Sequence, residues 1–116
     1  MSVLQTHALQ NPILTCGEFI LDRDALRAWR DTHELNLSLR QLRILELFME
    51  RPGQTVSRAF IRSTVWGYAA TAQGNSVDVE IGQIRKILRS KGGDNAIKTI
   101  RGSGFVFQPK EAKRQG

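Results

Sequence analysis

The pattern that most constrains this fold is a single apolar stripe between residues 75 and 90. Val77, Ile81, Ile84 and Leu88 are spaced four, three and four residues apart, so one side of an α-helix carries all of them. Asn75 is a favourable residue for the start of that helix. Since such a stripe must be covered by other parts of the chain, helix 75–90 packs on a core and leaves its opposite face outside.

Two further helices are predicted before this one. Ser38 and Gln41 have the Ser-x-x-Gln spacing of a capping box, in which the serine oxygen and the glutamine side chain bond free backbone N–H groups. Pro52-Gly53 ends the helix that starts there. A second helix is expected from Ser57 to about Trp66, with a buried stripe made of Phe60, Ile61, Val65 and Trp66.

Short strands are predicted on both sides of the helices. Four apolar-rich runs at 13–16, 18–21, 26–29 and 34–37 are separated by brief polar turns, and turns this short require an antiparallel sheet. Two alternating runs, 97–101 and 105–107, flank Gly102-Ser103-Gly104 and predict a β-hairpin. The fold class is therefore α+β: a four-stranded antiparallel sheet, three helices and a C-terminal hairpin. We expect eleven of the apolar residues to be buried: Leu42, Leu45, Phe48, Ile61, Val65, Val77, Ile81, Ile84, Leu88, Ile100 and Phe105.

The 116 residues divide into a leader or linker at 1–12, one domain at 13–108 and a basic tail at 109–116. The net charge of +6 is unevenly distributed, because residues 1–57 carry 6 Lys/Arg against 7 Asp/Glu and residues 58–116 carry 11 against 4. A one-sided excess of this kind suits a phosphate-rich partner. We expect one positive surface, formed by Arg62, Lys86, Arg89, Lys98 and Arg101.

The outer face of helix 75–90 has two residues that are unusual on a helix face exposed only to solvent. Val79 is apolar at the centre of the polar side, and Gly82 costs about 1 kcal/mol relative to alanine in a helix interior. A DNA major groove explains both, because valine packs on a thymine methyl group and glycine allows close approach of the helix backbone. Gln83 on the same face can bond an adenine edge. The alternative is a solvated helix with one exposed valine.

Several strings along the chain together resemble the DNA-binding effector domain of OmpR/PhoB-type response regulators. They are Leu37–Gln41, Val56-Ser57-Arg58, Val65-Trp66-Gly67, Val77–Leu88 and Thr99–Phe107. The resemblance covers roughly residues 13–108 and implies a winged helix-turn-helix that binds double-stranded DNA to regulate transcription. Helix 75–90 would enter the major groove, and hairpin 97–107 would be a wing in the minor groove.

The resemblance also implies which residues meet DNA and which partners the domain has. The implied DNA-binding residues are Trp66, Asn75, Ser76, Val79, Glu80, Gln83, Arg85, Lys86, Arg89, Lys98, Thr99 and Arg101. Members commonly bind tandem repeats as dimers on DNA, and loop 67–74 is associated with RNA polymerase contacts. This chain departs from the family at Asn75, Gly82 and Gln83, where basic residues are common, and at Glu80, where histidine is common. Two arrangements fit: an effector domain that follows a receiver domain, or a stand-alone regulator.

Other functions find little support in the sequence. No convergent set of titratable groups and no phosphate-cradling glycine loop indicate an enzyme, so no catalytic residue, cofactor or metal is predicted. Cys16 is a single cysteine and Asp78 is expected to pair with an arginine. A lone cysteine cannot form an internal disulfide, so a reducing cytoplasmic setting is expected. No apolar run approaches the length of a membrane span. The competing interpretation is a winged-helix module that binds a protein such as RNA polymerase, with weak or no DNA binding.

Overall fold

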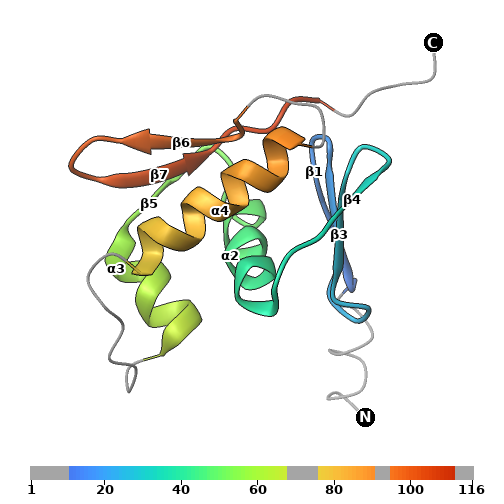
Figure 1. Ribbon diagram of the computed structural model, residues 1–116, viewed down its shortest axis with the longest axis horizontal. Helices are drawn as coiled ribbons and strands as arrows, with labels where there is room; N and C mark the ends of the chain where they lie inside the picture. Colours follow the sequence, from blue (N-terminus) through green and yellow to red (C-terminus); the bar gives the residue numbers. More distant parts are fainter. Residues whose placement is uncertain (1–10, 68–75, 91–94, 112–116) are drawn as a thin grey trace.

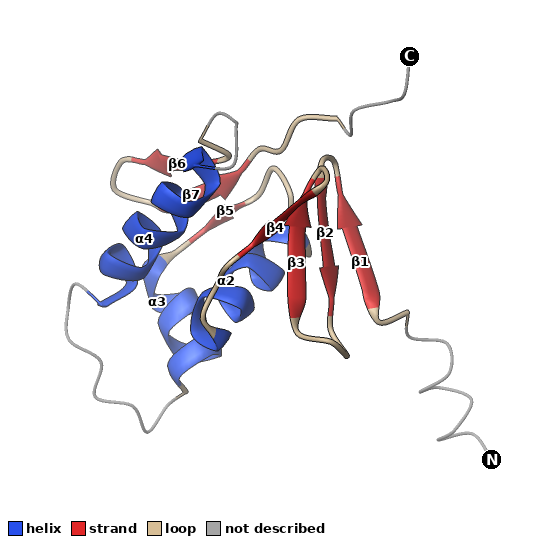
Figure 2. Cartoon of the chain, turned by 45° about the vertical axis from the view of Figure 1, so that its right-hand side comes forward, coloured by secondary structure: helices blue, strands red, loops and turns tan. Residues whose placement is uncertain are grey.

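The four N-terminal strands form one antiparallel sheet, as predicted. The computed structural model describes residues 11–67, 76–90 and 95–111. In it β1 (Ile13–Cys16), β2 (Phe19–Asp22), β3 (Arg27–Arg30) and β4 (His33–Leu35) pair in the order β1-β2-β3-β4. The strands begin and end within two residues of the expected positions. Figures 1 and 2 show this sheet on one side of the helices.

The three predicted helices are present, and the first starts where the sequence places it. Helix α2 (Leu39–Met49) has Ser38 as its N-cap, and both bonds of the capping box with Gln41 form. Helix α3 (Arg58–Ile61), capped by Ser57, continues into a widened π-helical segment η1 (Arg62–Trp66). Helix α4 (Ser76–Ser90) is the longest in the described residues, at 15 residues.

The C-terminal hairpin belongs to a second sheet that the sequence did not reveal. Strands β6 (Ile97–Ile100) and β7 (Gly104–Phe107) form the predicted hairpin, and a two-residue strand β5 (Thr55–Val56) pairs with β7 to give the order β5-β7-β6. Gly104 permits this pairing, because a Cβ there would collide with the carbonyl oxygen of Val56. The hairpin is therefore paired through β7 with the segment that links α2 to α3, and its turn projects outward (Figure 1).

Most of the predicted core is buried, and the side of α4 that was predicted to face the core does so. Val77, Ile81, Ile84 and Leu88 are all at most 1% exposed. Three aromatic rings from separate elements meet beside them: the ring of Phe107 lies 5.0 Å from that of Phe19 and 6.2 Å from that of Phe48, measured between centroids. The wing thus shares one core with the sheet and the helices.

Two of the eleven apolar residues expected in the core are not buried. Ile100 is 37% exposed, because it lies opposite Gly104 at the outer end of the hairpin, where the wing extends beyond the helices. Val65 is only half-buried. It lies in η1, where each turn contains more residues than in an α-helix, so a stripe drawn at 100° per residue no longer applies.

A buried ion pair joins the sheet to the end of α4. The guanidinium of Arg30 contacts Glu18 at 2.8 and 3.0 Å and donates a third bond to the carbonyl oxygen of Leu88 at 3.2 Å. Arg30 and Glu18 are 2% and 5% exposed. The backbone N–H of Glu18 also donates to the carbonyl oxygen of Lys110 at 2.9 Å, so ordered contacts continue two residues beyond the predicted domain end at 108.

Candidate nucleic-acid interface

The outer face of α4 is open along its described length. Val79 is 48% exposed, and Gln83, Lys86 and Arg89 are also exposed. Ser76 and Glu80 are half-buried at the edge of this face. The structure therefore brings together six of the predicted α4 residues, while Asn75 lies outside the described residues.

The edge of this face is bonded to helix α2 through one buried side chain. The amide nitrogen Nε2 of Gln41 donates to Oε1 of Glu80 at 3.0 Å and to Oε1 of Gln83 at 3.1 Å. Gln41 is 6% exposed. Sequence reasoning used Gln41 only for the capping box and missed this contact, since nothing in the local pattern places α2 against residues 39 to 42 positions later.

Arg85 differs from the other predicted residues because its guanidinium is directed to the wing. It donates to the carbonyl oxygen of Ile97 at 2.8 and 3.0 Å and to the hydroxyl of Thr99 at 2.9 Å. Burial, together with the charge of Arg89, lowers the pKa of Arg85. The arrangement fixes the wing relative to α4, so the two parts of the predicted interface are held as one unit.

Arg58 and Asp78 fix the orientation of α4 relative to α3. Their side chains form an ion pair at 2.9 Å, as expected from the sequence, and the hydrogen bond from Arg58 to Asp78 raises the pKa of Arg58. The Arg58 guanidinium also lies 4.7 Å from the ring centroid of Phe105 in the wing. One side chain thus contacts both α4 and β7.

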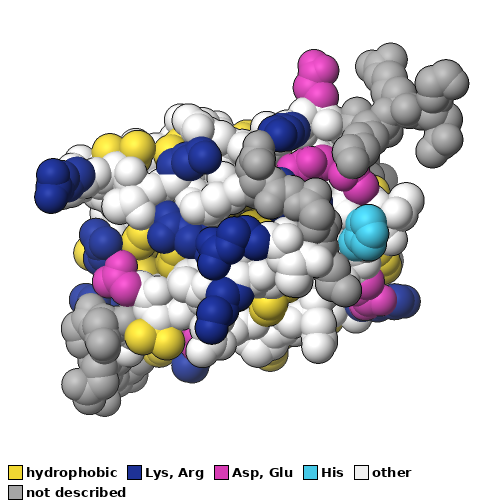
Figure 3. Space-filling model, turned by 45° about the horizontal axis from the view of Figure 1, so that its top comes forward, with side chains coloured by type: hydrophobic (Ala, Val, Ile, Leu, Met, Phe, Trp, Pro, Cys, Tyr) yellow, Lys and Arg dark blue, Asp and Glu magenta, His cyan; other side chains and the backbone are white. Residues whose placement is uncertain are grey.

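The wing presents three predicted residues to solvent. Lys98, Thr99 and Arg101 are exposed, and Arg101 lies in the turn between β6 and β7. Figure 3 shows basic side chains spread over the face that α4 and the hairpin form, with most acidic side chains near the four-stranded sheet. Of the five residues expected on a positive surface, four are exposed and Arg62 is half-buried.

Trp66 lies at the end of η1, next to loop 67–74, of which residues 68–74 lie outside the described residues. Its ring is half-buried, and the guanidinium of Arg40 lies 4.8 Å from its centroid. Trp66 was predicted in the buried stripe of the second helix but is only half-buried, because the turns of η1 contain more residues than those of an α-helix.

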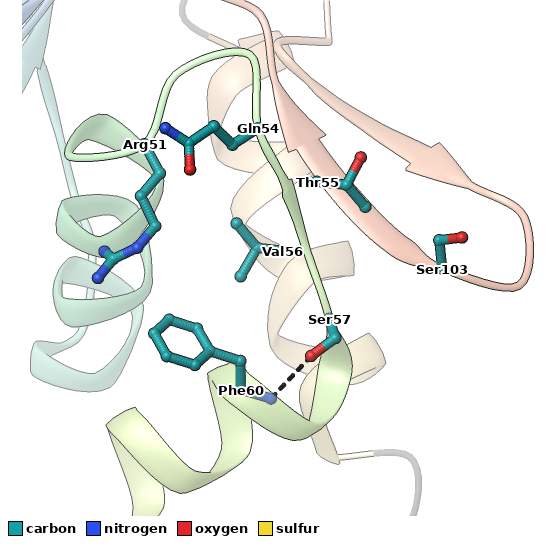
Figure 4. A pocket seen from close by; sticks show the side chains of 7 residues that line it. All are labelled: Arg51, Gln54, Thr55, Val56, Ser57, Phe60 and Ser103. Atoms are coloured by element: carbon teal, nitrogen blue, oxygen red, sulfur yellow. Dashed lines mark hydrogen bonds between the residues drawn. The ribbon is translucent and has the colours of Figure 1, made fainter.

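A further residue of the stripe predicted for the second helix is not buried. Phe60 was expected in its buried stripe but is 40% exposed. Figure 4 shows it beside an open hollow between α2, β5 and the wing turn, with the Ser57 cap bond next to it. The physical reason is that Ile61 alone points to the core from this short helix, while the Phe60 ring is covered by the Arg51 guanidinium at 5.0 Å.

Within residues 11–67, 76–90 and 95–111, no three His, Cys, Asp or Glu side chains gather as a metal ion would require. None of the helices in this part of the chain has the length and hydrophobicity needed to cross a bilayer.

A helix-turn-helix followed by a β-hairpin that is bonded to the second helix of the motif defines a winged-helix domain. The chain belongs to the family described as "Transcriptional regulatory protein, C terminal", whose sequence model matches residues 32–107. The resemblance to OmpR/PhoB-type effector domains is thereby confirmed.

Two curated relatives show the same relationship. The chain is 36% identical over 96 residues to the phosphate regulon transcriptional regulatory protein PhoB of Rhizobium meliloti, covering 83% of this chain and 42% of PhoB. It is 35% identical over 94 residues to the transcriptional regulatory protein TcrA of Mycobacterium tuberculosis, covering 81% of this chain and 37% of TcrA. The chain thus spans about two fifths of these relatives.

Solved structures of two isolated DNA-binding domains match this chain over nearly their whole length. The DNA-binding domain of RstA from Klebsiella pneumoniae, in complex with the RstA box, gives a TM-score of 0.71 at 26% identity, covering 84% of this chain and 97% of that one. The DNA-binding domain of CpxR from E. coli gives 0.72 at 27% identity, with coverage of 84% and 97%.

Proposed function

We propose that this chain binds double-stranded DNA sequence-specifically and regulates transcription. The observation that carries the proposal is the exposed outer face of α4, which Arg85 couples to a wing that presents Lys98 and Arg101. Helix α4 enters the major groove and hairpin β6–β7 reaches the minor groove. The related RstA domain has been solved in complex with its DNA box, which supports DNA binding by this chain.

The interface residues divide by chemistry into three groups. Val79, Glu80 and Gln83 face base edges, since they offer a methyl surface, an acceptor and an amide. A second group offers cationic, hydroxyl, amide or indole donors to phosphates and sugars. It consists of Trp66, Asn75, Ser76, Lys86, Arg89, Lys98 and Thr99. Arg101 enters the minor groove, where a narrow A·T-rich groove attracts a cation. Arg85 acts through the wing that it positions.

The wider setting follows from the same proposal. The domain would act in the cytoplasm as the effector part of a two-component response regulator, and it would pair on tandem DNA sites. Loop 67–74 is proposed as a contact for RNA polymerase. The described residues form no coiled-coil pattern, so pairing is expected on DNA rather than before it.

The salt dependence of DNA binding tests the proposal. The affinity for duplex DNA should fall as salt rises, because each neutralised phosphate releases counterions. Lys86→Ala should lower the slope of log K against log salt by about one unit. Arg27→Ala is the matched control: it removes the same charge from β3, on the four-stranded sheet, and should leave the slope unchanged.

One observation favours a second function. Glu80 places a carboxylate at the edge of the proposed groove face, where it would repel phosphate. A protein-interaction module with weak or no DNA binding is therefore the competing proposal. The competing proposal would be favoured if the chain did not bind duplex DNA at low salt. It would also be favoured if Lys86→Ala and Arg27→Ala gave equal slopes of log K against log salt.

A further inference from the structure

The side-chain amide of Gln41 has only one orientation that satisfies its neighbours. Its oxygen accepts a hydrogen bond from the backbone N–H of Ser38 at 3.0 Å, and its nitrogen donates to Glu80 at 3.0 Å. A backbone N–H only donates and a carboxylate oxygen accepts. If the amide were reversed, donor would face donor and acceptor would face acceptor, so its direction is fixed from both ends.

This fixed amide determines the orientation of a second one. The nitrogen of Gln41 lies 3.1 Å from the side chain of Gln83, and because an NH₂ group only donates, the Gln83 atom that faces it must be the oxygen. The NH₂ group of Gln83 is then turned away from Gln41. Gln83 is exposed on α4, whereas Gln41 is buried in the first turn of α2.

We propose that Gln41 is a positioning residue for base readout and that it makes Gln83 a reader of guanine. This inference rests on the proposed placement of α4 in the major groove. An unconstrained glutamine pairs with adenine by using its oxygen and its nitrogen together, on N6 and N7. With its oxygen held by Gln41, Gln83 presents two N–H donors, which match the two acceptors N7 and O6 of guanine.

The first test replaces the donor and keeps the capping box. In Gln41→Glu the new side chain still accepts from the Ser38 N–H, since glutamate serves this position as well as glutamine does. It offers no donor, so the Glu80 carboxylate, which accepts from Gln41 at 3.0 Å in the parent protein, is repelled and turns to solvent. The Gln83 amide reverses, so that its NH₂ bonds the carboxylate at position 41 and its oxygen faces the groove. Preference should then move to a base with an amino group in the major groove, adenine or cytosine.

The experiment selects bound sequences from a library of randomised duplexes with the full chain. The base pair that Gln83 contacts is the one whose preference disappears in Gln83→Ala. At that pair the parent protein should enrich guanine, and Gln41→Glu should enrich adenine or cytosine, with a change of about fivefold or more. Gln41→Met, which has neither donor nor acceptor, should lose the guanine preference and guards against effects of the added charge.

A control separates positioning from general damage to the helix-turn-helix. Ser57→Ala removes the cap of α3, where Ser57 Oγ accepts from the N–H of Phe60 at 3.1 Å, and does not touch Gln41. It should leave the base preference as in the parent protein, and circular dichroism should show that each variant is folded. Adenine at this pair in the parent, or guanine retained in both Gln41 variants, would overturn the inference while DNA binding stands. A parent protein that enriches no sequence would overturn the proposed function, and this inference with it.

Discussion

Removing the buried arginine of the Arg30–Glu18 pair should be among the most damaging single changes in this chain. Arg30→Met deletes two contacts with Glu18 and the bond to the Leu88 carbonyl oxygen. It leaves the Glu18 carboxylate buried without a counter-charge, at 5% exposure. The cost arises from that uncompensated charge more than from the lost attraction.

The expected magnitude follows from this burial. Removing one partner of a buried ion pair costs about 3–5 kcal/mol, which is a large share of the ~5–15 kcal/mol that stabilises a typical domain. At roughly 4 °C per kcal/mol for a domain of this size, the melting temperature should fall by about 12–20 °C. The double variant Glu18→Gln/Arg30→Met should recover part of the loss, since no unpaired charge remains.

Urea unfolding followed by circular dichroism gives the free energy of unfolding for each variant. Arg27→Met is the matched control: Arg27 is also on β3 and pairs with Glu34 at 2.7 Å, but the two side chains are 52% and 45% exposed. Solvent screens that pair, so its loss should change stability little. The reasoning fails if Arg30→Met and Arg27→Met have equal effects, or if the double variant is less stable than Arg30→Met alone.

Three further predictions concern single positions. Gly82→Ala should stabilise the protein by ~1 kcal/mol in thermal unfolding, because nothing lies within 4 Å of an added Cβ. Weaker DNA binding by the same variant would show that close approach to the groove needs the glycine, and unchanged binding would refute that role. Gly102→Ala should cost ~1–2 kcal/mol for its left-handed backbone, and Gly104→Ala should cost more, because its Cβ also meets the Val56 carbonyl; equal urea midpoints would contradict this. Burial raises the pKa of Cys16, so less thiolate is present at pH 8 than in an unfolded chain. Alkylation of Cys16 should be slow in the folded protein, rise only at higher pH and accelerate in guanidinium. Equal alkylation rates in the folded and unfolded chain would refute the effect of burial.

The sequence was most informative where one physical demand governs a long segment. The core-facing side of α4 was predictable because one buried stripe runs along all 15 residues of the helix. The α2 cap was predictable because Ser38 and Gln41 form each other's hydrogen bonds within four residues of sequence. Strand β5 has two residues, too few for any periodic pattern. Ile100 fits an alternating strand, but its burial depends on how far the wing extends beyond the helices.

The contacts that shape the candidate interface were the least predictable. Gln41 meets Glu80 and Gln83, and Arg85 meets the wing, only after the helices have packed. A polar side chain on a predicted outer face can point to solvent, to DNA or to a neighbouring element, and the pattern along one helix does not distinguish these. Predicting a reading face from a helical wheel therefore requires the packing of the neighbouring helix as well.

The strand order β5-β7-β6 has a consequence for synthesis of the protein. The central strand of that sheet, β7, is the last of the elements in the described residues (Figure 1). Its Phe107 supplies a ring to the core next to Phe19 and Phe48. While the chain is still on the ribosome, β5 has no partner strand and the core lacks this ring. The domain can therefore complete its folding only after residue 107 has emerged, whereas any domain encoded upstream would have folded earlier.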